Sequence, residues 1–301
     1  MTKSAQLAVR IQGRTVTVQT EAGPLEMPLH DWIEELRPPV FDAGGIRWPD
    51  GVVGHRPLRD GGVVLVHETP PMVRRLRWVA DDSPEPFGPG AVYRDVSLAL
   101  PYVVTLVVFM RKGKQLQLTS HNEAFFRTSP LSSFDDHLLC PALLNCSRMV
   151  DDGSNPVSWI CVQKLSPRTW NTSRGDAKRL RAGTGALLQH LYETGFNKSS
   201  DVHELSSWYT ETIEAGVDPR VRSLDNWEAA SRDDSLFVLD VPWLTSGHTV
   251  QTVLERMEKR LGLHEDKPTT AEDLARLVIN RPRPGRRRAV SSKSLFEGLL
   301  G

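Results

Sequence analysis

The residues best suited to chemistry lie in one short stretch, from Phe125 to Cys140. Its thiol, Cys140, follows His137 by three residues, and two aspartates precede that histidine. A thiolate is a strong nucleophile, and a thioester keeps an acyl group activated for transfer. The serines, proline and aspartates before Cys140 favour a surface loop. The stretch therefore predicts an exposed thiol that another molecule can reach, with His137 as a candidate general base.

Two other interpretations of this thiol stay open. The run from Leu138 to Leu144 is mostly apolar, and a cysteine within it can serve as a small buried hydrophobe. Cys140, Cys146 and Cys161 could also ligate zinc together with His137, although their spacing contains no C-x-x-C pair. The adjacent aspartates would raise the pKa of the thiol by favouring its neutral form.

The bulk composition describes an ordinary globular chain. It has 301 residues, 39% of them hydrophobic and 25% charged, which is enough to bury a core. The formal net charge is +0, so no overall field favours nucleic acid or anionic lipid. Three cysteines fit a reducing compartment, no apolar signal core opens the chain, and the run from Leu98 to Met110 is too short to span a bilayer. We therefore expect a cytoplasmic protein that does not enter membranes.

The elements that must position the thiol begin with strands. Alternating or continuous β-prone runs fill much of the first 120 residues and predict an antiparallel meander that opens with an N-terminal hairpin. Residues 41–62 hold many Gly, Pro and Asp residues and are expected to form a loop. The predicted strands are 7–11, 15–19, 63–66, 73–79, 92–98, 102–110 and 115–119.

Helices dominate the second half of the chain. Residues 121–172 show little regular periodicity. Helical stripes then cover 174–193, 201–213, 225–231, 250–261 and 269–278, with one strand expected at 236–241. The predicted fold class is therefore α+β, an antiparallel meander followed by helices.

This order suggests four segments. They are an N-terminal β-rich extension (1–60), an α+β core (61–245), a C-terminal helical segment (246–280) and a basic flexible tail (281–301). The tail contains an arginine-rich run at 281–288 that could touch phosphates, although a solvated tail explains it equally well. No phosphate-binding Gly-rich loop and no G-x-S-x-G motif occurs.

The order of these parts resembles the ubiquitin-conjugating enzyme superfamily, in which a meander leads through a His-Pro-Asn motif to a thioester cysteine. Ser129-Pro130-Leu131 would take the place of that motif, with Pro130 matching and Cys140 at a similar distance. The closer resemblance is to the bacterial PRTRC system protein B-like family. It is carried by Leu100–Val104, by the segment from Ser129 to Cys140 and by Phe196–Ser199.

The resemblance implies a fold, a reaction and partners. Cys140 would accept a ubiquitin-like protein as a thioester and pass it to an amine, with His137, Asp135 or Asp136 assisting. The implied partners are a ThiF-type activating enzyme, a β-grasp ubiquitin-like protein and a JAB-type metalloprotease.

This chain departs from the motif at two of its three positions. Ser129 and Leu131 replace the His and the Asn, and a leucine cannot donate the hydrogen bond with which that Asn supports the oxyanion site. Asn122 and Asn145 are the candidate substitutes. Two alternatives therefore stand beside the transferase: a catalytically inactive binding or scaffold module of the same fold, and a nucleic-acid-associated accessory protein that uses the basic tail.

Overall fold

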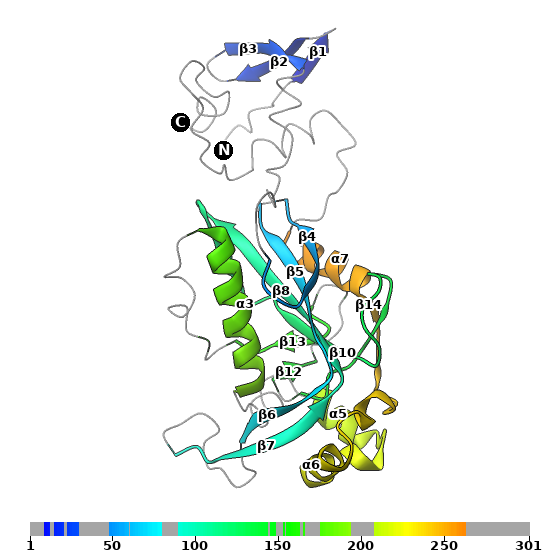
Figure 1. The fold of residues 1–301 in the computed structure, drawn as a ribbon. Helices are drawn as coiled ribbons and strands as arrows, with labels where there is room; N and C mark the ends of the chain where they lie inside the picture. The colour runs from blue at the N-terminus through cyan, green and yellow to red at the C-terminus, as the bar shows by residue number, and fades with distance from the viewer. Residues whose placement is uncertain are drawn as a thin grey trace. The chain divides into compact units, whose positions relative to one another are not determined.

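The computed structural model describes residues 9–12, 15–20, 23–29, 48–59, 61–79, 90–143, 145–148, 153, 155–162, 165, 175–193 and 208–262. The chain divides into two compact units, one made of Met1–Val40 with Glu265–Gly301 and the other of Phe41–His264 (Figure 1). The expected segments at 196–199, 269–278 and 281–288 lie outside the described residues.

The first unit contains a small antiparallel sheet. Its strands are β1 (Val9–Gln12), β2 (Thr15–Thr20) and β3 (Gly23–Pro28), in the order β1-β2-β3. Val16 and Val18 on β2 are buried against partly buried apolar neighbours. The N-terminal hairpin predicted from the sequence is confirmed, because β1 and β2 pair from Val9 with Val18 to Gln12 with Thr15.

The second unit is built on a nine-stranded antiparallel sheet. β5 (Val63–Thr69) and β8 (Tyr102–Lys112) pair at its centre and are buried along most of their length, as expected for apolar strands covered on both faces. β8 pairs on its other edge with β9 and β10. The other strands are β4 (Val52–Pro57), β9 (Gln115–Leu118), β10 (Glu123–Arg127), β11 (His137–Leu139), β12 (Cys146–Ser147), β13 (Trp159–Ile160) and β14 (Thr245–Thr249).

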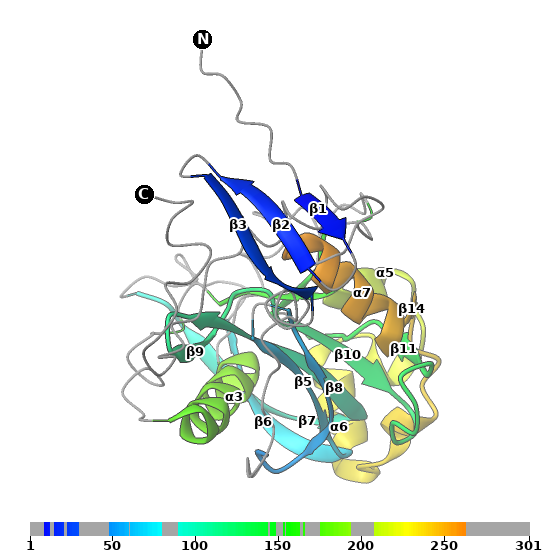
Figure 2. The ribbon, with the colours of Figure 1, turned by 90° about the horizontal axis from the view of Figure 1, so that it is seen from above.

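Helices cover both faces of this sheet. α3 (Asp176–Glu193) packs on one face against β8 and β9, and α7 (Val250–Arg260) lies on the other (Figures 1 and 2). Gly183 lets α3 approach closely, since a Cβ there would lie 2.7 Å from the Phe109 ring. α5 (Trp208–Glu214) and α6 (Leu224–Asp233) precede α7, and the 3-10 helices are η1 (Pro219–Val221) and η2 (Phe237–Leu239).

The α+β class is confirmed, but the meander is interrupted. β6 (Met72–Val79) and β7 (Tyr93–Leu100) pair only with each other among the described strands, while β5 pairs directly with β8. The pattern on β6 explains this, because exposed Arg75 and Arg77 alternate with buried Leu76 and Trp78. A strand with one polar face cannot occupy the doubly covered centre of the sheet.

Three further expectations are corrected. Residues 52–57, placed in a loop, form β4 and pair with β5. Residues 236–241 contain the 3-10 helix η2 (Phe237–Leu239) and no strand, because the Asp234 carboxylate accepts a hydrogen bond from the Leu236 amide at 2.8 Å and favours a local turn. Residues 121–172 contain β10, whose five residues are all buried.

The segment boundaries also differ from the sequence-based division. β4 belongs to the main sheet, so residues 52–57 are not part of a separate N-terminal extension. α7 belongs to the same unit, and its Val250, Val253, Leu254 and Met257 are buried in the common core. The observed boundaries fall at Val40–Phe41 and His264–Glu265.

Candidate functional site

Cys140 lies at the end of β11, a short strand inserted between two others. Leu139 of β11 pairs with Phe126 on β10 and with Thr245 on β14. The Cys140 amide donates a hydrogen bond to the Leu244 carbonyl at 2.7 Å. The backbone around the thiol is therefore bonded to segments on both sides.

The Cys140 side chain is fully buried, with 0% exposure. Burial is the main cause that raises the pKa of its thiol to about 12, and the nearby Glu211 carboxylate acts in the same direction. At pH 7 a pKa near 12 leaves only about one thiol in 10⁵ ionised. The prediction that Cys140 is exposed is wrong, and the alternative of a buried apolar run describes its position.

The loop before Cys140 is exposed but firmly held. Arg127, at the end of β10, donates hydrogen bonds to the Ser129 carbonyl at 3.1 Å, the Pro130 carbonyl at 3.3 Å and the His137 carbonyl at 2.8 Å. It also forms an ion pair with Asp136 at 3.1 Å. One buried guanidinium thus fixes both ends of the Pro-to-Cys segment.

Asp136 and His137 lie at the end of this loop, where Asp136 bonds to the loop's own backbone. The Asp136 carboxylate accepts hydrogen bonds from the amides of Ser132 at 2.7 Å and Ser133 at 3.2 Å, and these bonds lower its pKa. His137 is exposed, whereas Cys140 is buried. The structure does not bring the three candidate residues into one accessible site.

The groups considered for an oxyanion site bond elsewhere. The Leu131 amide donates to the Glu68 carboxylate at 2.6 Å. The Asn122 amide group is fully buried and connects the Val108 amide with the Thr119 carbonyl across the gap between β9 and β10. Asn145 is buried and donates to the His190 carbonyl at 3.3 Å. Both asparagines are therefore buried and bonded within the fold.

The zinc interpretation has no support in the described part of the chain. Cys140, Cys146 and Cys161 are all buried and carry free thiols. Among the described residues there is no group of three or more His, Cys, Asp or Glu side chains that could hold a metal ion. His190 instead shares a 2.8 Å hydrogen bond with the Cys161 carbonyl.

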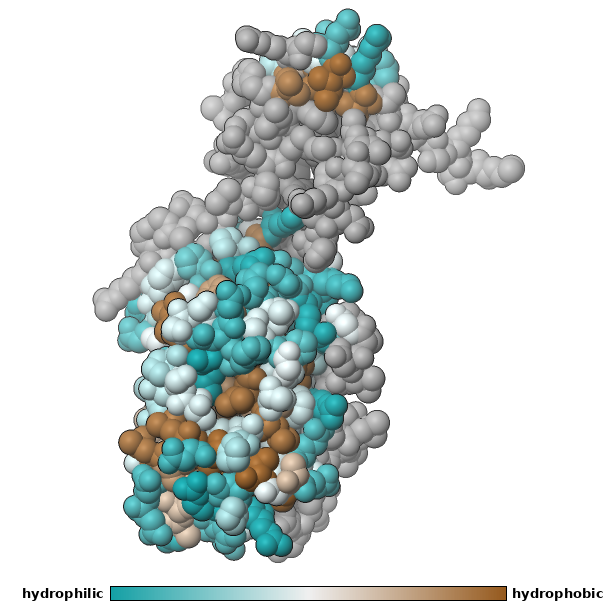
Figure 3. Space-filling model, turned by 90° about the vertical axis from the view of Figure 1, so that its right-hand side faces the viewer, coloured by the Kyte–Doolittle hydropathy of each residue, from teal (hydrophilic) through white to brown (hydrophobic). Residues whose placement is uncertain are grey.

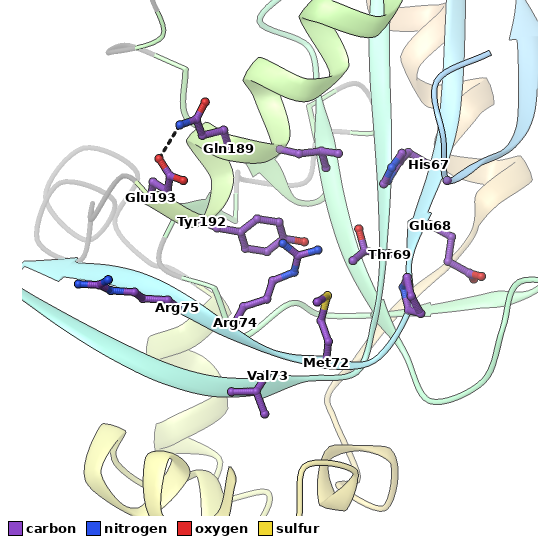
Figure 4. Close-up of a pocket in the computed structure, with 13 residues that line it drawn as sticks. His67, Glu68, Thr69, Met72, Val73, Arg74, Arg75, Gln189, Tyr192 and Glu193 are labelled. Atoms are coloured by element: carbon purple, nitrogen blue, oxygen red, sulfur yellow. Dashed lines mark hydrogen bonds between the residues drawn. The ribbon is translucent and has the colours of Figure 1, made fainter. Parts of the chain in front are cut away.

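A pocket that the sequence did not predict adjoins the loop before Cys140, since its lining includes Glu68, the acceptor of the Leu131 amide. It has a volume of about 510 Å³ and lies between the end of β5, the start of β6 and the last turns of α3 (Figure 4). His67 and Thr69 come from β5, Arg74 from β6 and Tyr192 from α3. Each contributes a polar side chain to the walls of this pocket.

These four side chains hold polar atoms that form no hydrogen bond with the described residues: His67 Nδ1, Thr69 Oγ1, Arg74 Nε and Tyr192 OH. His67, Thr69 and Tyr192 are each exposed by 6% or less. The Arg74 guanidinium lies 4.3 Å from the centre of the Tyr192 ring. Figure 4 shows these two side chains next to each other. Burial lowers the pKa of His67 and raises that of Tyr192 to about 12. At neutral pH these four side chains therefore combine one cation with uncharged donors and acceptors.

Sequence reasoning missed these residues, although one signal was present. His67-Glu68-Thr69 continues the apolar strand Val63–Val66 with polar residues, of which His67 and Thr69 are buried and Glu68 is half-buried. Arg74 interrupts the apolar side of the next strand. Their convergence with Tyr192 depends on how α3 packs, and no local pattern reports that packing.

Comparison with known proteins adds no relative: neither a family model, nor a curated protein, nor a solved structure matches this chain. Among the described residues no helix has the length and apolarity needed to cross a bilayer. The face that carries α7 and β14 mixes polar and apolar side chains (Figure 3). The function of the protein must therefore be argued from the surroundings of Cys140 and from the pocket between β5, β6 and α3.

Proposed function

We propose that this protein is a non-catalytic binding module with a ubiquitin-conjugating-like arrangement, in which Cys140 belongs to the core. The observation that carries the proposal is the 0% exposure of that cysteine. A thioester carrier must present its sulfur to an incoming activated carbonyl, and a reactive cysteine needs a lowered pKa. Cys140 has neither property, because burial raises the pKa of its thiol to about 12.

The surrounding hydrogen bonds support this proposal. Hydrogen bonds hold the chain around Cys140 against the segment that contains β14. The Cys140 amide donates to the Leu244 carbonyl at 2.7 Å, and the Ser246 hydroxyl donates to the Leu138 carbonyl at 2.7 Å. Each such bond contributes on the order of 1 kcal/mol, and leaving its partners buried without a bond costs more.

The departures in the sequence agree with this view. Leu131 stands where the resemblance expects an asparagine, and its side chain supplies no hydrogen-bond donor. Removing one oxyanion donor typically costs about a hundredfold or more in rate. A chain that lacks both an accessible thiol and that donor is better suited to holding a partner than to transferring it.

The partners in this proposal are those that the resemblance implies. A β-grasp ubiquitin-like protein and its ThiF-type activating enzyme are the first to test, with a JAB-type metalloprotease as a third. The thioester-transfer hypothesis predicts a covalent adduct on Cys140 with the same partners. One experiment therefore separates the two functions.

The test incubates the full chain with ATP, the activating enzyme and the ubiquitin-like protein, followed by electrophoresis with and without reductant. We expect no reductant-sensitive adduct on the wild-type chain, and equal non-covalent binding of the ubiquitin-like protein by wild type and Cys140→Ala. An adduct that vanishes in Cys140→Ala and becomes reductant-resistant in Cys140→Ser would overturn the proposal. The matched control is His137→Ala, which removes an exposed side chain from the same segment and leaves the core unchanged. It should bind the ubiquitin-like protein as the wild type does.

A further inference from the structure

The pocket between β5, β6 and α3 is lined by polar side chains that packing alone does not explain. Buried polar atoms are nearly always hydrogen-bonded, because a missing bond costs the full desolvation of the group. Here four side chains that line one cavity leave such atoms without a partner among the described residues. The Thr69 hydroxyl lies beside that of Tyr192 and lowers the pKa of the phenol against the larger, opposite effect of burial.

The charges around the pocket leave one cation available. Arg75 forms an ion pair with Asp95 at 2.6 Å. The Glu68 carboxylate accepts the Leu131 amide, and the Glu193 carboxylate accepts a hydrogen bond from Gln189 at 2.7 Å. The Arg74 guanidinium forms no ion pair with a described carboxylate and stays against the Tyr192 ring. A guanidinium is permanently charged and matches a carboxylate or phosphate group geometrically.

The neighbouring groups discriminate between these anions. Thr69 and Tyr192 add two hydroxyl donors beside the guanidinium, which suits an oxyanion. The carboxylates of Glu68 and Glu193 also line the pocket, so a doubly charged phosphate would meet repulsion that a single cation cannot offset. A group with one negative charge can pair with Arg74 and meets less repulsion from these carboxylates than a dianion does.

The rest of the lining is apolar and includes Pro70, Met72, Val73 and Leu188. A volume of about 510 Å³ lies in the range of small-molecule sites. We propose that this pocket binds a small organic carboxylate, whose charged group contacts Arg74, Thr69 and Tyr192 and whose apolar part lies against Met72 and Leu188. His67, held on one side by the Asp50 backbone, presents Nδ1 to a hydrogen-bond donor of the ligand.

The first test compares three probes of one shape: benzoate, neutral benzamide and the dianion phenyl phosphate. Each is titrated into the full chain at constant ionic strength, and amide chemical shifts are followed by NMR. Benzoate is expected to give saturable shifts confined to residues 67–75 and 188–193. Because a charge-assisted hydrogen bond is lost, benzamide is expected to bind at least about tenfold more weakly. Equal affinity for benzoate and benzamide, or no saturable shifts with benzoate, would overturn the proposal.

Two variants and one control show which side chains contribute to benzoate affinity. Arg74→Gln is expected to weaken benzoate binding by at least about tenfold, and Tyr192→Phe by roughly three- to tenfold. The matched control is Arg75→Gln, which removes an adjacent guanidinium already paired with Asp95 and should leave the affinity unchanged. If Arg74→Gln does not fold, Tyr192→Phe decides the matter. Unchanged affinity in the folded variants refutes the site, and phenyl phosphate binding tenfold more tightly than benzoate refutes the carboxylate assignment.

Discussion

Two glycines of α3 provide a sharp test of how this helix packs. Gly183 and Gly185 are two residues apart in the same helix, yet a Cβ at Gly183 would lie 2.7 Å from Cε1 and 2.9 Å from Cζ of Phe109. A Cβ at Gly185 would meet nothing within 4 Å. The alanine substitutions Gly183→Ala and Gly185→Ala therefore differ mainly in the close contact with that ring.

The magnitude follows from two opposing effects. Each alanine gains about 1 kcal/mol of helix propensity over glycine. Carbon atoms in favourable contact are about 3.5–4.0 Å apart, so the new methyl group at Gly183 overlaps the ring by roughly 1 Å. Phe109 is fully buried between β5 and β9 and has little freedom to move. Overpacking of this kind typically costs about 1–3 kcal/mol.

We therefore expect Gly185→Ala to raise the free energy of unfolding by up to about 1 kcal/mol, with Gly183→Ala about 1–3 kcal/mol below it. Urea unfolding followed by tryptophan fluorescence measures both. The Gly183→Ala/Phe109→Leu double variant should show a favourable coupling, because the smaller side chain leaves room for the methyl group. Equal stabilisation by both alanines would refute the described packing of α3 on β8.

Further predictions concern the charged groups that fix β10 and its loop. The Glu123 carboxylate is fully buried and pairs with Arg260 at 3.0 Å. Arg260→Leu should therefore lower the free energy of unfolding by about 3–5 kcal/mol, because it leaves the carboxylate buried without its partner. Adding Glu123→Gln should restore part of this loss in a double-mutant cycle measured by urea unfolding. A single-variant cost below about 1 kcal/mol would contradict the pair. The pKa of Asp136 is lowered in the fold by amide hydrogen bonds from Ser132 and Ser133, so its stabilisation is present above the ordinary value of 3.8 and is lost as the pH falls through the folded-state pKa. Asp136→Asn should therefore lower stability by about 1 kcal/mol at pH 6, and the difference from wild type should shrink progressively as the pH falls below 3.8; a difference that is constant with pH would be inconsistent with this role.

Much of the fold could be predicted from local patterns. The apolar run of β8, the turn at Gly113 with its φ of 60° and the stripe of α3 all follow from residue types and spacing. β10 was missed because Glu123 and Arg127 mark its ends as polar. Their partners, Arg260 and Asp136, lie elsewhere in the sequence, and only the folded chain brings these charges together.

The position of the thiol shows the same limit more clearly. The residues from Ser129 to His137 predict a loop, and the structure has one that is largely exposed. At Leu138 the chain enters the core, because β14 lies beside it. That strand follows far along the chain, so no pattern near Cys140 distinguishes an exposed thiol from a buried one.

A Cys140 that belongs to the core must be inaccessible in the folded protein, and alkylation of the native chain measures this accessibility. The full-length protein is treated with iodoacetamide at pH 7.5, and modification of each cysteine is followed by peptide mass spectrometry against a sample unfolded in guanidinium chloride. We predict that Cys140 reacts as slowly as the buried Cys146 and Cys161 in the native protein, at less than about one-hundredth of the unfolded rate. Rapid, selective alkylation of native Cys140 would contradict this inaccessibility and support the thioester carrier instead.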